Sequence, residues 1–207
     1  MEPENGETVV TTIDSNIQEL AEDQLSKFEK KYGSKGSSIL VMNPNNGEIY
    51  AMANSTSYNL ESPRDDKNLL KKYSQSQVNK MSEKEKAKAF NEIWKNPIVS
   101  NAFEPGSTYK PFTVAAGLEE GILKGNETYY CDGYQKIGPH TIHCSHRSGH
   151  GLITLSQSIS LSCNDALMQI AAKEGKNVFA RYQKNFNFGN KTGIDLPGEA
   201  QTASLLH

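Results

Sequence analysis

The sequence predicts an α+β domain. Three patterns indicate this class: an amphipathic helical pattern after Asp14, two short strand patterns around a turn at residues 43–47, and helical patterns separated by loops after residue 104. A chain of 207 residues has room for one domain or slightly more.

The composition excludes two functional classes. Twenty-two Lys and Arg residues against 24 Asp and Glu residues give a net charge of −2, so no basic excess is available to neutralise a nucleic-acid backbone. The longest apolar run, residues 39–42, is far shorter than the roughly 20 residues that a membrane span needs. The acidic first residues are not typical of a signal peptide. We therefore expect a water-soluble globular piece.

The first 52 residues predict a strand, a helix and a hairpin. Residues 8–13 are rich in β-branched side chains and predict a strand. Asp14 stands where a helix N-cap is expected, and the apolar spacing behind it predicts a helix to about Tyr32. Residues 38–41 and 48–52 predict two strands joined by the turn at 43–47, which is a β-hairpin.

A polar insertion is expected around residues 55–95. Residues 54–80 are rich in Ser, Asn and Lys with almost no apolar spacing, so they predict irregular structure. The basic residues here are interpreted as a solvated surface rather than a polyanion site. Ser82 and Glu85 form a capping-box pattern that predicts a helix through Trp94, closed by Pro97.

The second half is less polar and carries most of the helical signal. We expect a helix from Ser107 to about Gly121, a loop over residues 131–151, and two helices over 153–162 and 166–173. The last segment, 188–200, is rich in Gly and Pro and predicts a loop.

Ser107 and Lys110 have the spacing of a nucleophile and its base. Residues three apart lie on one face of a helix, so the hydroxyl and the amine can meet. A lysine amine activates a serine when burial lowers its pKa. The pair alone is a weak signal, since Ser and Lys are common. Ser162 and Asn164 strengthen it, because a second hydroxyl can relay protons and an amide can hold a peptide.

The segment Glu-Pro-Gly-Ser-Thr-Tyr-Lys-Pro at residues 104–111 resembles the active-site segment of class B high-molecular-weight penicillin-binding transpeptidases. The resemblance covers nearly the whole chain, through residues 10–18, the hairpin, Gly-His-Gly at 149–151 and residues 189–199. The insertion alone lacks a counterpart. The resemblance implies a transpeptidase domain with an antiparallel sheet flanked by helices. Residues 1–207 would be the incomplete N-terminal part of that domain.

The resemblance also implies the role of each site residue. Ser107 would attack the D-Ala-D-Ala carbonyl or a β-lactam ring, and its N–H would form half of the oxyanion hole. Lys110 would be the base, Ser162 the proton shuttle and Asn164 the group that fixes the donor peptide. Lys-Thr-Gly at residues 191–193 matches the family's third motif in letters only, because Ile194 follows it. We therefore expect the true third motif, on a core strand, beyond residue 207.

The implied function is that of a peptidoglycan D,D-transpeptidase with a serine acyl-enzyme. Its expected partners are peptidoglycan stem peptides, β-lactams, the C-terminal remainder of the same domain and a membrane-bound glycosyltransferase. The family would place the catalytic domain outside the cell membrane, with an N-terminal anchor outside these residues. The alternative is a β-lactam sensor domain that acylates without transpeptidation.

The three cysteines could form a disulfide, remain free thiols or bind a metal ion. The spacing of Cys131, Cys144, His150 and Cys163 is not that of a zinc finger, so a Cys131–Cys144 disulfide and three free thiols are both alternatives. Four soft ligands are, however, the number that a closed zinc site takes. Some transpeptidases of this group hold a metal in the equivalent loop, so the resemblance favours structural zinc. Asp132, His143 and His146 are possible substitute ligands.

Overall fold

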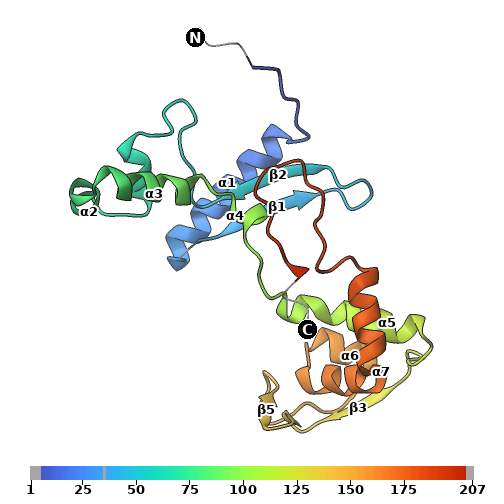
Figure 1. Cartoon of the computed structure of the whole chain (residues 1–207). Helices are drawn as coiled ribbons and strands as arrows, with labels where there is room; N and C mark the ends of the chain where they lie inside the picture. The colour runs from blue at the N-terminus through green and yellow to red at the C-terminus, as the bar shows by residue number, and fades with distance from the viewer. Residues whose placement is uncertain (1–5, 35, 204–207) are drawn as a thin grey trace. The chain divides into compact units, whose positions relative to one another are not determined.

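The computed structural model describes residues 6–34 and 36–203 (Figure 1). Its contacts divide the chain into two compact units, residues 1–101 with 195–200, and residues 102–194 with 201–207. Helices and antiparallel strand pairs occur in both units, which confirms the α+β class. The strands of the described residues form three separate pairs rather than one continuous sheet. Within those residues we find no helix with the length and apolar character of a membrane span.

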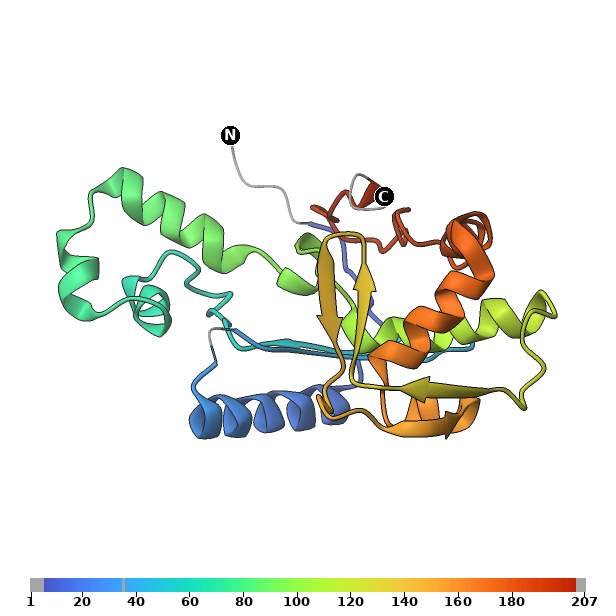
Figure 2. The ribbon, with the colours of Figure 1, turned by 90° about the horizontal axis from the view of Figure 1, so that it is seen from below.

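The first unit is built on helix α1 (Ser15–Tyr32) and the hairpin of β1 (Ser38–Met42) and β2 (Ile49–Asn54), as predicted. Asp14 caps α1, since its carboxylate accepts from the N–H groups of Asn16 and Ile17. Helix α1 lies along the strand pair (Figure 2). The buried residues between them are Ala21, Leu25, Ala51 and Ala53.

The strand predicted at residues 8–13 is wrong. This segment runs beside β2, but the Thr12 hydroxyl replaces the backbone ladder: it donates to the Ile49 carbonyl at 2.7 Å and accepts from the Ile49 N–H at 3.1 Å. Val9 and Val10 are 82% and 90% exposed, so the β-branched run has no core to face.

The prediction of irregular structure at residues 54–80 holds for residues 55–65 but is wrong for most of residues 66–80. A short 3₁₀-helix, η1 (Asp66–Lys71), and helix α2 (Gln75–Lys80) pack with α3 (Glu83–Trp94) around five buried residues. These residues are Leu69, Val78, Ala89, Phe90 and Ile93. The capping box of Ser82 and Glu85 is present as predicted. Pro97 opens the short helix α4 (Pro97–Ser100) instead of closing α3, which ends three residues before it.

The second unit begins with a 3₁₀-turn, η2 (Gly106–Tyr109), that runs into helix α5 (Lys110–Glu119). Strand β3 (Thr128–Cys131) pairs antiparallel with β6 (Gly151–Thr154), and β4 (Tyr134–Ile137) pairs with β5 (His140–His143). Helices α6 (Leu155–Ser160) and α7 (Asn164–Asn185) follow.

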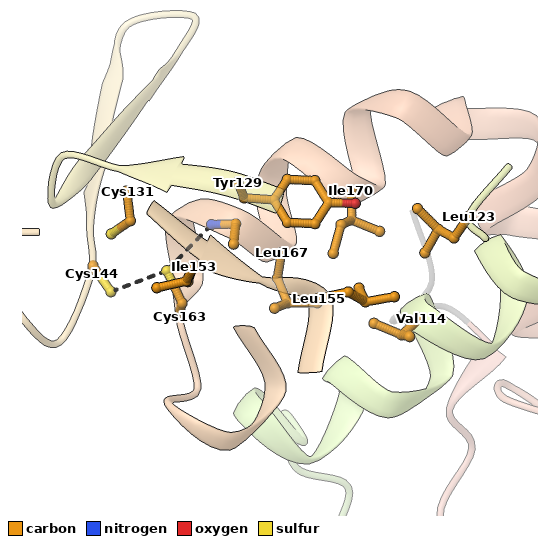
Figure 3. Packing of buried hydrophobic residues seen from close by; sticks show 11 residues of the cluster. Val114, Leu123, Tyr129, Cys131, Cys144, Ile153, Leu155, Cys163, Leu167 and Ile170 are labelled. Atoms are coloured by element: carbon orange, nitrogen blue, oxygen red, sulfur yellow. Dashed lines mark hydrogen bonds between the residues drawn. The ribbon is translucent and has the colours of Figure 1, made fainter. Parts of the chain in front are cut away.

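Two predictions for the second unit therefore need correction. Residues 131–151 contain a hairpin and not only a loop, and residues 153–154 belong to β6 and not to a helix. The strands have four residues each, too few to give a periodic pattern. The buried cluster between α5, β3, β6 and α7 includes all three cysteines at one end (Figure 3).

One carboxyl of this unit is buried without a hydrogen bond. Glu174 is 6% exposed, and neither of its oxygens has a partner among the described residues. It lies in α7 beside Gly175, whose φ of 76° and ψ of 161° interrupt the helix. Burial raises the pKa of Glu174 to about 7. Because the ordinary pKa of glutamate is about 4.3, the folded protein loses stability as the pH rises from there to about 7.

We expect Glu174→Gln to remove this loss. At pH 4 the variant and the wild type should have similar free energies of unfolding, because both side chains are neutral. At pH 8 the variant should be more stable by about 1–3 kcal/mol, because the wild type must either bury an ionised carboxylate or take up a proton, whereas glutamine stays neutral. Urea unfolding at both pH values measures the difference, with the exposed Glu119→Gln as control. A difference that does not grow with pH would contradict the assignment.

Candidate active site

Ser107 lies in η2, one 3₁₀-turn before Lys110. Side chains at i and i+3 eclipse one another in a 3₁₀-helix, so the two residues share a face, as the sequence predicted. Ser107 is exposed and Lys110 is half-buried. Gly106, just before Ser107, has a φ of 57°, a conformation that favours glycine and produces the sharp entry into the turn.

Lys110 joins the first motif to the second across 52 positions of the chain. Its Nζ donates to the Ser162 hydroxyl at 2.9 Å, the Ser162 carbonyl at 2.6 Å and Asn164 Oδ1 at 2.7 Å. The structure therefore brings Lys110, Ser162 and Asn164 together. Three donors are the full capacity of an ammonium group, and a neutral amine would free one position for a proton from a serine hydroxyl.

Burial lowers the pKa of Lys110, although the nearby Cys144 and Cys163 sulfurs oppose this in part. The lysine thus loses its proton at a lower pH than an exposed lysine does. This direction is the one that a general base for a serine hydroxyl requires.

Ser162 occupies a strained turn between α6 and α7. Its φ is 51°, in the left-handed region that residues with a Cβ rarely adopt. Such strain persists only where the surroundings hold it, and it concentrates at functional sites. Here the Ser162 N–H donates to the Ile159 carbonyl at 3.0 Å, and Cys163 caps α7 through its sulfur. The turn presents both oxygens of Ser162 to Lys110.

The three cysteines and His150 form one cluster beside this turn. Their ligand atoms all lie within 4.8 Å of one another. Nδ1 of His150 is 3.5 Å from Cys131 Sγ and 3.7 Å from Cys144 Sγ, and the Cys144 and Cys163 sulfurs are 3.9 Å apart. The three cysteines are free thiols and all are buried.

The three separations of 3.5, 3.7 and 3.9 Å are close to those of a tetrahedral zinc site. Bonds of about 2.3 Å to sulfur and about 2.0 Å to nitrogen require ligand atoms roughly 3.5–3.8 Å apart. Burial opposes ionisation of the Cys144 thiol, but hydrogen bonds from the backbone of His146, Asn164 and Asp165 and from Cys163 outweigh it and lower the pKa. Burial raises the pKa of Cys163. A bound cation would favour the thiolate form of both.

Two glycines allow the cluster to close. Gly133 and Gly149 have φ values of 100° and 81°, and a Cβ on either would collide with backbone across the loop, at Arg147 and at Cys131. Asp132, His143 and His146, the substitute ligands, lie outside the cluster of four. His146 instead bonds to Ser148 at 3.0 Å.

The Lys-Thr-Gly sequence at residues 191–193 lies in an irregular segment after α7 and not on a strand. The structure thus does not give it the setting expected for the family's third motif.

The sequence analysis missed Asp165. This residue follows Asn164 directly and is fully buried, and its carboxylate accepts three hydrogen bonds. An aspartate in the first turn of a helix usually faces solvent, so no local signal marks its burial.

Comparisons with known proteins identify the relatives of this chain. The family model "Penicillin binding protein transpeptidase domain" matches residues 37–204. Stage V sporulation protein D of Bacillus subtilis is 32% identical over 95% of this chain and 27% of its own length. Peptidoglycan D,D-transpeptidase MrdA of Acinetobacter baumannii is 27% identical over 97% of this chain and 27% of its own length.

A solved structure, penicillin-binding protein 3 from Mycobacterium tuberculosis, is similar with a TM-score of 0.72 and 26% identity, over 93% of this chain and 38% of that chain. The chain thus spans about a quarter of the length of these two curated relatives. The match over residues 37–204 confirms the resemblance, and the chain belongs to the penicillin-binding protein transpeptidase family.

Proposed function

We propose that this chain carries the nucleophile of a peptidoglycan D,D-transpeptidase that β-lactams also acylate. The observation that carries the proposal is the contact of Lys110 Nζ with the Ser162 hydroxyl and Asn164 Oδ1, with Ser107 three residues before Lys110 in the adjoining 3₁₀-turn. The family supports the reaction class.

In the proposed reaction, Ser107 Oγ attacks the carbonyl carbon of the peptide bond between the two D-Ala residues, and its proton passes to Lys110. The Ser107 N–H stabilises the oxyanion. The C–N bond then breaks, and Ser162 relays the proton to the amine of the leaving D-Ala. An acceptor amine then attacks the carbonyl carbon of the resulting ester: a new C–N bond forms, the bond to Ser107 Oγ breaks, and a proton of the amine passes through Lys110 to Ser107 Oγ. Asn164 holds the donor peptide through its amide.

The test is a covalent adduct on Ser107. The natural protein that carries this sequence should gain the mass of one penicillin on the peptide containing Ser107, measured by mass spectrometry. Ser107→Ala should abolish the adduct, because the bond-forming oxygen is lost. Thr108→Val, which removes the adjacent hydroxyl that donates to Pro105, is the matched control and should keep the adduct. An adduct that persists in Ser107→Ala would overturn the assignment.

A β-lactam sensor would form the same adduct but would not transfer the acyl group. Release of D-Ala from a pentapeptide donor, with formation of a cross-linked product, separates the two functions. The relatives named as D,D-transpeptidases support the enzyme.

We also propose that Cys131, Cys144, His150 and Cys163 hold a structural zinc ion. The fit of their ligand separations and their burial support this. A bound zinc ion would join the loop of residues 131–150 to Cys163, which lies between Ser162 and Asn164. Its role would be to order the second motif, and no reaction step needs it.

The location of the proposed substrate suggests where the protein acts and with which partners. Peptidoglycan lies outside the cytoplasmic membrane, so we propose an extracytoplasmic site on a membrane-anchored protein, working with a membrane-bound glycosyltransferase. The C-terminal remainder of the same domain is a further proposed partner, since the solved relative is matched over only 38% of its chain.

A further inference from the structure

Asp165 is a buried carboxylate that connects two elements. It has no exposed surface, and a carboxylate removed from water is costly unless hydrogen bonds compensate it. Oδ1 accepts from Gln135 Nε2 at 2.6 Å and from Gln169 Nε2 at 2.8 Å, and Oδ2 accepts from the Asp132 N–H at 3.2 Å. Gln169 belongs to α7, whereas Asp132 and Gln135 belong to the start of the β4–β5 hairpin.

These bonds help to place the hairpin, together with the buried Cys131 and Cys144 at its two ends. Figure 2 shows it, in gold, leaving the β3–β6 pair. All four residues of β5 and three of the four in β4 are exposed, so apolar burial does little to hold it, and an isolated two-stranded hairpin is marginally stable. Gln169 adds a bond from α7 to the Tyr130 carbonyl at 2.8 Å. The Asp165 network is therefore a polar link between the start of the hairpin and the first turn of α7, beside the Asn164–His143 bond at its end.

The hairpin in turn holds the amide of Asn164. The His143 carbonyl, at the end of β5, accepts from Asn164 Nδ2 at 3.1 Å. An amide has its acceptor on one side and its donor on the other, so this bond directs Asn164 Oδ1 towards Lys110, where it accepts at 2.7 Å. If the hairpin moves, the amide loses the partner that fixes its orientation.

We propose that Asp165 is a positioning residue for Asn164. By seating the β4–β5 hairpin on α7, it keeps the His143 carbonyl on the Asn164 amide and thus the amide oxygen on Lys110. This inference rests on the proposed function, because it concerns the residues that would activate Ser107. Asp165 acts through Asn164 and not on the reacting atoms.

The test is the second-order rate constant for acylation of the natural protein by a fluorescent penicillin. Asp165→Ala and Gln135→Ala should each slow acylation about tenfold, the coupling expected within one hydrogen-bonded network. Asp165→Asn retains one acceptor oxygen and should recover part of the loss. In an Asn164→Ala background neither substitution should slow acylation further, because the group they position is absent.

The control is Ser158→Ala. Ser158 is equally buried and donates to the Leu155 carbonyl at 2.6 Å within α6, outside the network. Its loss should lower the melting temperature without changing the rate constant, which separates positioning from stability. If Asp165→Ala does not fold, Gln135→Ala decides the test, since Gln135 is only half-buried.

Two results would overturn the positioning role: wild-type rates in Gln135→Ala, or losses that add fully to that of Asn164→Ala. A wild-type protein that forms no penicillin adduct would instead overturn the proposed function.

Discussion

Replacing Lys110 by alanine is expected to slow acylation of Ser107 about 10²–10⁴-fold, the contribution of a positioned general base. Lys110→Arg is the sharper variant. Arginine keeps a cation that can donate to Ser162 and Asn164, but it does not deprotonate, so it should be nearly as inactive as alanine. The rate constant for penicillin acylation measures both, and the exposed Lys124→Ala is the control.

The pH dependence gives a second readout for Lys110. The base must be neutral, so the wild-type rate should rise with pH through the pKa of Lys110, which burial places below the ordinary lysine value. The arginine variant should lack this rise. An arginine variant that acylates near the wild-type rate would show that Lys110 acts only by holding the second motif in place.

Loss of the proposed zinc is expected to have the second large effect. The purified protein should contain about one zinc per chain, by elemental analysis. Cys144→Ser removes one of four ligands and should cost roughly 3 kcal/mol, which lowers the melting temperature by about 6–12 °C. Acylation should slow as well, because Cys163 lies inside the second motif.

His140→Gln is the control for the zinc prediction, because His140 is exposed on the same hairpin and outside the cluster. It should change neither zinc content nor melting temperature. A metal-free protein with full activity and a Cys131–Cys144 disulfide would contradict the zinc site.

Local signals predicted the elements that are determined locally. Asp14 and the Ser82–Glu85 capping box identify helix starts, because a cap acts within one turn of its own residue. The strand predicted at residues 8–13 is absent because a strand needs backbone hydrogen bonds to a partner strand. Here the Thr12 hydroxyl, and not its backbone, bonds to the N–H and carbonyl of Ile49. The two shorter helices of the insertion, η1 and α2, were not predicted, because six residues are too few to show a period.

The candidate site likewise has features that are local in the sequence and features that depend on distant residues. The spacing of Ser107 and Lys110 is local and readable from the sequence, whereas the contact of Lys110 with Ser162 and Asn164 could be expected only from a family resemblance. Asp165 could not be found, because its burial depends on donors that lie 30 or more positions earlier in the chain. Backbone groups such as the His143 carbonyl leave no mark in the sequence at all.

The separate core of the insertion has a consequence for the effects of substitutions within it. Leu69, Val78 and Ile93 are buried among one another and among residues of the same segment. The free-energy costs of substitutions there should add to, and not couple with, those of substitutions around Ser162, which share no partner with them. We therefore expect substitutions in the core of the insertion to change stability without changing the turn at Ser162.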